Sequence, residues 1–178
     1  MGPVTIGVDI GQKVDPTAIA VVEFDRRPQT KQVAQPAGSG SSGVVLVEAR
    51  TTTEAHLFLD ATGVGTPVVD VLRDAGVAAR LIPCYFTHGD KRTHAGGQVS
   101  IGKAWLVSRL QVLLQSERLH LPDTAEAHAL AKELQDYEIR VSEDANDRYG
   151  AFKVGTHDDL VTALGLAVQP RRFTRLLP

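Results

Sequence analysis

The chain has few of the features that would settle its class at once. It has one cysteine, Cys84, which excludes an internal disulfide and favours a reducing compartment. Its apolar runs are too short to span a bilayer, and no basic segment followed by an apolar one marks a signal peptide. The formal net charge is -2, so no overall basic excess marks the chain as a nucleic-acid binder. We therefore expect a cytoplasmic protein without membrane attachment.

What remains is the composition of an ordinary globular protein. Of the 178 residues, 43% are hydrophobic and 22% are charged, and this length suits one domain with a sizeable core. We therefore expect residues 1–178 to form a single domain. Between Arg26 and Gly43 the composition changes to proline, glutamine, glycine and serine. This change predicts a flexible segment around residues 36–43.

Hydrophobic patterning predicts an α/β protein. Residues 4–10 and 17–25 are expected to form an antiparallel hairpin, followed by strands over 44–49 and 57–60. Thr66 suits the N-cap of a helix that ends before Gly76. We expect the following further elements: a strand over 77–86 that bends at Pro83, a polar loop over 88–97, a helix over 103–117, a helix capped by Asp123 or Thr124 that runs through Leu134, hairpin strands over 138–142 and 149–153, and a last helix over 158–168.

Acidic residues recur at the ends of these elements. Asp9 follows a short apolar strand, where an uncompensated charge is costly, so either a cation lies beside it or its pKa is raised. Asp60 ends the strand over 57–60, and the pair Asp158 and Asp159 begins the last helix. Carboxylates suit Mg²⁺ or Mn²⁺, whereas clusters of histidine and cysteine suggest zinc. If the two strands are neighbours, these acids predict a metal centre.

Each acid also has a simpler interpretation. Asp9 could be a turn residue at a strand end, and Asp60 could be a turn or cap residue before Gly63. Asp158 and Asp159 could stabilise the positive end of the helix dipole. We favour metal binding because the acids occur together, and the choice between Asp158 and Asp159 stays open.

Three segments resemble the nuclease domain of phage terminase large subunits. They are Gly7-Val-Asp9-Ile-Gly11 with Asp15-Pro-Thr-Ala-Ile-Ala20, then Leu59-Asp60-Ala-Thr-Gly-Val-Gly65, and then His157-Asp158-Asp159-Leu-Val161. The resemblance covers most of the chain. It implies an RNase H-like fold, in which helices flank a mixed sheet. It also implies a metal-dependent endonuclease that cuts double-stranded DNA during genome packaging.

The same resemblance assigns roles to individual residues. Asp9, Asp60 and Asp158 would be the catalytic metal ligands of a two-metal site for Mg²⁺ or Mn²⁺, with Asp159 as a nearby fourth acid. In this scheme Asp9 bridges both ions, the other two ligands each hold one, and an activated water attacks the phosphodiester. Independently of the resemblance, we expect His157 to lie beside the ligands or in solvent rather than on the metal, although it could supplement the last ligand position.

Two differences from the family pattern affect these expectations. The full family protein joins an ATPase motor to the nuclease, and this sequence has no phosphate loop of the Walker type. The resemblance therefore implies a separate ATPase motor, with a small terminase subunit and a portal as further partners, in the host-cell cytoplasm. Secondly, only residues 50–56 separate the strands over 44–49 and 57–60, at most about two helical turns. The first crossover helix is therefore expected to be shortened or lost.

Two questions stay open at this level. Lys91, Arg92 and Lys103 could contact DNA phosphates, or could simply be solvated. Asp9-Ile-Gly11, followed by a hairpin that contains threonine, also resembles the phosphate-binding hairpin of sugar kinases and actin-like ATPases. The alternatives to a nuclease are therefore a fragment of such an ATPase, or a catalytically degenerate interaction module of a packaging complex.

Overall fold

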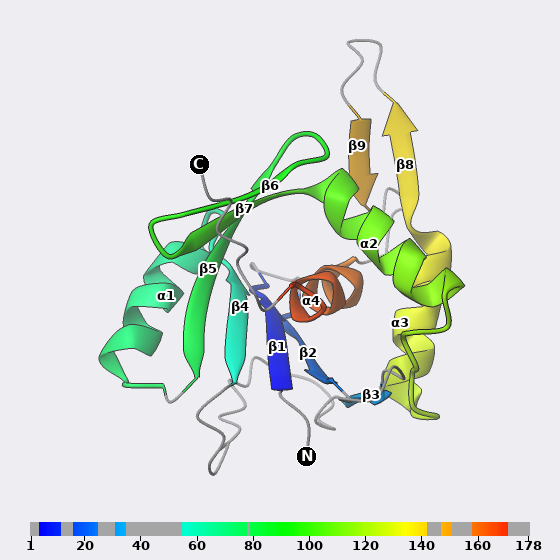
Figure 1. Cartoon of the computed structure of the whole chain (residues 1–178), viewed down its shortest axis with the longest axis horizontal. Helices are drawn as coiled ribbons and strands as arrows, with labels where there is room; N and C mark the ends of the chain where they lie inside the picture. Colours follow the sequence, from blue (N-terminus) through cyan, green and yellow to red (C-terminus); the bar gives the residue numbers. More distant parts are fainter. Residues whose placement is uncertain are drawn as a thin grey trace, which may run out of the picture.

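The computed structural model describes residues 4–11, 16–24, 31–34, 55–77, 79–141, 147–150 and 158–170. The strands are β1 (Val4–Asp9), β2 (Ala18–Glu23), β3 (Lys31–Ala34), β4 (His56–Asp60), β5 (Arg80–Thr87), β6 (Arg92–Ala95), β7 (Gln98–Gly102), β8 (Glu138–Val141) and β9 (Asp147–Gly150). The helices are α1 (Gly65–Asp74), α2 (Lys103–Gln115), α3 (Ala125–Asp136) and α4 (Asp159–Ala167). Seven strands form one mixed sheet in the order β3-β2-β1-β4-β5-β7-β6, and β8 and β9 form a separate hairpin. Helices cover both faces of the large sheet (Figure 1).

The strand directions gather several strand ends at one edge of the sheet. β1 runs antiparallel to β2 and parallel to β4, as expected for a hairpin followed by a crossover. β5 is parallel to β4, and β7 is parallel to β5. The carboxyl ends of β1, β4, β5 and β7 therefore lie along the same edge. Hereafter this edge is called the carboxyl edge.

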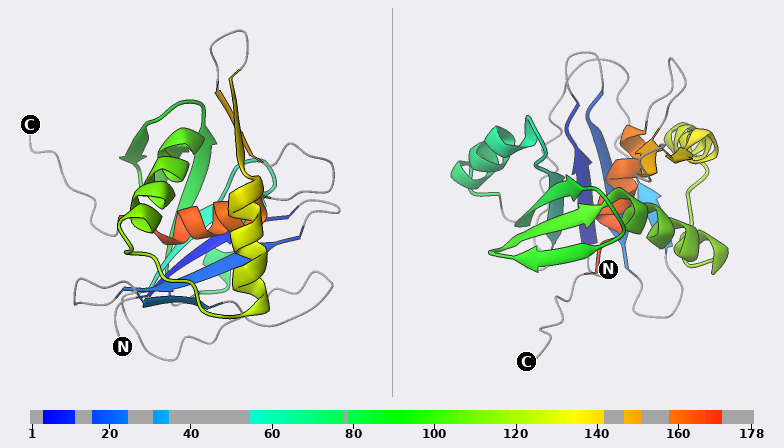
Figure 2. Two further views of the ribbon diagram at one scale, coloured as in Figure 1. Left: turned by 90° about the vertical axis from the view of Figure 1, so that its right-hand side faces the viewer. Right: turned by 90° about the horizontal axis from the view of Figure 1, so that it is seen from above.

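Alternation along the strands divides the core between two faces of the sheet. Val8 and Leu59 pack with Val69 of α1 on one face. Phe58 and Cys84 belong to the larger core on the other face, together with apolar residues of α2, α3 and α4. Successive side chains of a strand point to opposite faces, so each strand supplies both cores. Figure 2 shows α1 alone on its side, with α2, α3 and α4 on the other.

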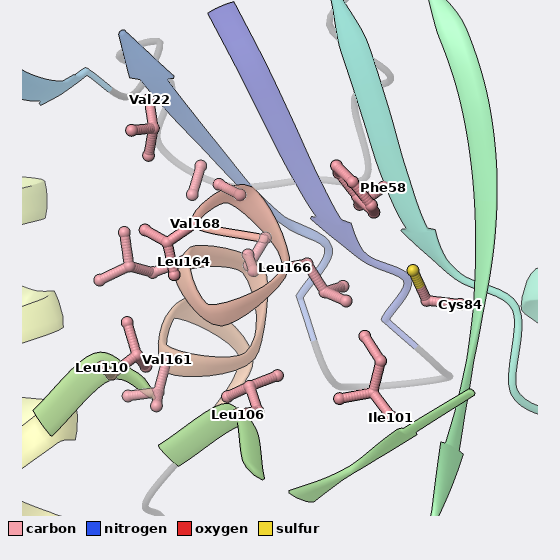
Figure 3. Packing of buried hydrophobic residues seen from close by; sticks show 14 of the residues in the cluster. Val22, Phe58, Cys84, Ile101, Leu106, Leu110, Val161, Leu164, Leu166 and Val168 are labelled. Atoms are coloured by element: carbon pink, nitrogen blue, oxygen red, sulfur yellow. The ribbon is translucent and has the colours of Figure 1, made fainter. Parts of the chain in front are cut away.

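α4 is the central helix of the larger core (Figure 3). All residues from 161 to 169 are buried, which explains why this segment, apart from Thr162 and Gln169, is apolar on every side rather than along one stripe. Its backbone lies directly on β1: a Cβ at Gly7 would collide with the carbonyl oxygen of Ala163 and the amide nitrogen of Ala167. On the opposite side, a Cβ at Gly165 would collide with Leu106 of α2. Glycine at these positions lets α4 pack closely on both sides.

Several expectations about the elements need correction. β3 (Lys31–Ala34) was not predicted and lies inside the segment rich in glycine and proline. The strand expected over 44–49 falls outside the described residues and stays a prediction. The polar loop expected over 88–97 instead contains β6, which pairs with β7 across a turn of Gly96 and Gly97. β6 carries mostly exposed polar residues at the sheet edge, so it shows no hydrophobic alternation. The flexible segment over 36–43 and the reduced crossover helix also fall outside the described residues.

The structure agrees only in part with the predicted helix caps and with the predicted strand that contains Pro83. Thr124 caps α3 as expected, since its Oγ1 accepts a hydrogen bond from Ala127 N at 3.2 Å. Thr66 does not cap α1, because its Oγ1 donates to the carbonyl oxygen of Ala61 and the N-cap residue is Val64. β5 continues through Pro83, and its pairing with β7 begins only at Cys84. Pro83 therefore interrupts no pairing with β7. Among the described helices, none is long and apolar enough to cross a membrane.

Candidate metal centre

Asp9 and Asp60 end neighbouring parallel strands at the carboxyl edge. Val8 pairs with Leu59, so the two acids occupy the next positions on strands that are about 4.8 Å apart. Alternation places Asp9 on the same face as Gly7, which contacts α4. It likewise places Asp60 on the face of Phe58, which belongs to the core around α4. Both carboxylates therefore point to the α4 side of the sheet.

The start of α4 adds two more acids to this edge. Asp158 is the N-cap residue, and Asp159 is the first residue of the helix. The charges of Asp60, Asp159 and Asp158 each raise the pKa of Asp9, as expected for acids at one edge of the sheet. The structure thus brings Asp9, Asp60, Asp158 and Asp159 together. His157 lies outside the described residues.

The cluster carries more negative charge than its surroundings favour. Burial and, in decreasing order, the charges of Asp60, Asp159 and Asp158 together raise the pKa of Asp9 to about 8, while the charge of Lys103 opposes them. Burial also raises the pKa of Asp60, against the hydrogen bonds of Thr62 and the charge of Lys103. Thr62 N donates to Asp60 Oδ1 at 2.8 Å, which fixes that carboxylate at the end of β4. A cation among these groups would relieve the repulsion.

Lys103 is the cation that the fold brings to this edge. β7 ends at Gly102, and α2 begins with Lys103, so the parallel pairing of β5 and β7 places this lysine at the carboxyl edge. Its Nζ lies 3.7 Å from Asp158 Oδ2 and 5.5 Å from the centre of the Phe86 ring. Lys103 also lowers the pKa of both Asp9 and Asp60.

The other two residues expected to contact DNA have different environments. Arg92 Nε donates to Gln169 Oε1 at 2.8 Å, just beyond the C-terminal end of α4, and its guanidinium lies 5.8 Å from the Trp105 ring centre. Arg92 therefore contacts the opposite end of α4 from the acids. Lys91 is exposed, and its carbonyl oxygen accepts a hydrogen bond from Gly102 N at 2.8 Å. Its backbone is thus tied to the residue before Lys103.

Sequence patterns gave no role to Glu133 of α3. Its Oε2 accepts hydrogen bonds from Leu160 N at 2.9 Å and Val161 N at 3.3 Å, both in the first turn of α4. The pKa of Glu133 is raised to about 7, mainly by burial and also by the charges of Asp159 and Asp158, against the two backbone hydrogen bonds, which lower it. The available signal was its position: Glu133 follows the buried Leu130 by three residues, on the inward side of an amphipathic helix.

The donor set suits a hard divalent cation, because all four acids offer carboxylate oxygens. In the part of the chain that the structure describes, however, no group of three or more His, Cys, Asp or Glu side chains is arranged to hold a metal ion. The structure therefore supplies suitable donors at one edge without a closed set of ligands.

Comparisons with known proteins identify the fold. No family model and no curated protein matches the sequence. The large terminase nuclease of thermophilic phage G20c with bound magnesium matches over 93% of this chain and 79% of that one, at 19% identity and a TM-score of 0.60. The cobalt-bound structure of the same nuclease matches over the same shares, at 19% identity and a TM-score of 0.59. These matches confirm the expected α/β fold, a mixed sheet flanked by helices, which this chain shares with those nuclease structures.

Proposed function

We propose that this protein is a divalent-metal-dependent endonuclease that hydrolyses phosphodiester bonds of double-stranded DNA during phage genome packaging. The observation that carries the proposal is the convergence of Asp9, Asp60, Asp158 and Asp159 at one edge of the sheet. Support also comes from the fold, since a terminase nuclease of this fold carries magnesium or cobalt.

In this proposal Asp9, Asp60 and Asp158 hold Mg²⁺ or Mn²⁺ in a two-metal site, and Asp159 supplies further negative charge. The cations supply Lewis acidity, which activates water and neutralises the leaving oxygen. Among the described residues these side chains do not form a ready metal site, so binding requires them to rearrange. A bound cation would take the place of the proton on Asp9 and would relieve the repulsion among the acids.

Lys103 has a distinct part in the proposed reaction. With Asp158 engaged by the cation, the Lys103 ammonium can turn its three N–H donors to a phosphate oxygen. A cation beside the scissile phosphate stabilises charge that develops during hydrolysis. Lys91 is exposed near the start of α2 and can contact the DNA backbone farther from the cut. We do not assign DNA contact to Arg92, because its Nε is bonded to Gln169.

The packaging context suggests the partners. The proposed nuclease acts in the host-cell cytoplasm on DNA that a separate ATPase motor delivers. A small terminase subunit and a portal would complete the assembly.

Digestion of supercoiled plasmid in Mg²⁺ or Mn²⁺ tests the function. We expect cleavage that chelation with EDTA abolishes and that Asp9→Asn lowers at least about 100-fold, because a ligand is lost. Asp70→Asn is a matched control, since Asp70 lies on α1, is largely exposed and pairs with Arg73 at 3.4 Å. The control variant should cleave like the wild type. Full activity in Asp9→Asn would contradict the proposal, and ATP binding without cleavage would favour the actin-like ATPase.

A further inference from the structure

The start of α4 is capped in an unusual way. An aspartate at the N-cap position ordinarily accepts a hydrogen bond from the backbone N–H of the second or third helical residue. Asp158 occupies the N-cap position, and its backbone carbonyl accepts the first helical bond from Thr162 N at 2.9 Å. Its side chain nevertheless makes no capping bond. The carboxylate instead lies 3.7 Å from Lys103 Nζ.

Glu133 makes the bonds that the N-cap side chain does not. Leu160 and Val161 are the second and third residues of α4, and both backbone N–H groups donate to Glu133 Oε2. Glu133 comes from α3, 27 positions before Leu160 in the chain. These long-range bonds satisfy two of the four N–H groups that every helix start leaves unpaired. They also fix the first turn of α4 against α3.

We propose that Glu133 is a positioning residue of the carboxylate centre: it takes over the capping of α4, so that the Asp158 carboxylate is available to a divalent cation. This inference rests on the proposed function. An aspartate that capped its own helix would be directed at Leu160 N or Val161 N. With Glu133 in that place, Asp158 is directed toward Lys103 and the carboxyl edge.

The capping of α4 depends on where the Oε2 atom of Glu133 lies, and not on the negative charge of its carboxyl group. Glu133 is half-buried beside two other acids, and burial together with their charges raises its pKa to about 7, so near neutral pH the carboxyl group is partly protonated. A protonated carboxyl group keeps an oxygen that can accept from the two N–H groups. A neutral group with the same reach should therefore serve, whereas a shorter carboxylate should not.

Two conservative variants separate reach from charge. Glu133→Gln keeps the reach and removes the charge, while Glu133→Asp keeps the charge and shortens the side chain by one methylene. Glu126→Gln and Glu126→Asp are matched controls on the same helix, near its N-terminus. Calorimetric titration with Mn²⁺ measures the dissociation constant of the full chain, and its melting temperature in EDTA verifies folding.

We expect Glu133→Gln and both Glu126 variants to bind Mn²⁺ within about twofold of the wild type. Glu133→Asp should weaken binding about tenfold or more, as losses of groups that orient a ligand typically do. Plasmid cleavage should fall in the same variant and be retained in Glu133→Gln.

Other outcomes overturn the inference. Weak binding in Glu133→Gln, alone or together with Glu133→Asp, would show that the charge matters or that Glu133 binds the cation itself. Unchanged binding in Glu133→Asp would remove the positioning role and leave the proposed function standing. No Mn²⁺ binding by the wild type would refute the proposed metal centre and this inference with it.

Discussion

Replacing Asp9 with asparagine should stabilise the metal-free protein at alkaline pH, although it removes a residue proposed to be essential for activity. The carboxyl group ionises near pH 3.8 in the unfolded chain, whereas burial and the neighbouring acids raise its pKa in the folded protein to about 8. Between these values the folded state keeps a proton that the unfolded state has lost. Stability therefore falls as the pH rises from about 4 to about 8, and the loss is complete above that window.

The size of the effect follows from the two pKa values. A difference of about four pKa units corresponds to about 6 kcal/mol of destabilisation above pH 8. Asparagine has nearly the same shape without the charge, but its half-buried amide needs hydrogen-bond partners, which offsets about 1–3 kcal/mol. We expect a net gain of about 3–5 kcal/mol, which raises the melting temperature of a chain this long by roughly 10 °C.

The pH dependence identifies the cause. At pH 5 the wild-type penalty is only about 1–2 kcal/mol, so the offset from the amide should make the two proteins about equally stable. Melting temperatures in EDTA at pH 5, 7 and 8.5 measure the difference between wild type and variant. Adding Mn²⁺ at pH 8.5 should then raise the melting temperature of the wild type more than that of the variant. Equal or lower stability of Asp9→Asn at pH 8.5 would refute the assignment of a strongly raised pKa to Asp9.

Three further predictions concern other parts of the site and its support. Lys103→Met should lower plasmid cleavage about 10-fold to 100-fold, yet leave Mn²⁺ binding in calorimetry as tight or tighter, because it removes a competing cation from the acids. Weaker Mn²⁺ binding would contradict this. Gly7→Ala should destabilise the protein by about 3 kcal/mol or more in urea unfolding, because the new Cβ overlaps the carbonyl of Ala163. Leu164→Ala, at a fully buried position, should cost about 2–5 kcal/mol in the same assay, against less than about 0.5 kcal/mol for the control Val71→Ala at 65% exposure. A loss of stability below about 1 kcal/mol in Gly7→Ala or in Leu164→Ala would contradict the packing described for α4.

Local patterns in the sequence predicted much of the fold. Asp9 and Asp60 follow short apolar runs, and parallel strands end at one edge, so the pattern indicated acids that would lie together if the strands paired. The pairing of β1 with β4 has that register. α4 was also predictable, because its continuous apolar run is typical of a buried helix.

Features set by tertiary contacts were not predictable in this way. β6 is a polar edge strand without alternation, so only its pairing with β7 defines it. The parallel pairing of β5 with β7 brings Lys103 to the carboxyl edge, whereas the sequence alone gave Lys91, Arg92 and Lys103 the same two interpretations. Glu133 caps a helix distant in sequence, and a helical glutamate carries no local sign of such a partner.

The docking of α4 on β1 has a consequence for how the protein is made. Asp9 lies in the first strand, while Asp158 and Asp159 belong to the last helix described, so the acidic centre joins segments far apart in the chain. Contacts of such long sequence separation form late, because the intervening chain must first be ordered. Of the four acids, a nascent chain interrupted before Asp158 and α4 would carry only Asp9 and Asp60. The proposed DNA-cutting site is therefore assembled only after α4 has been synthesised and has packed on the finished sheet.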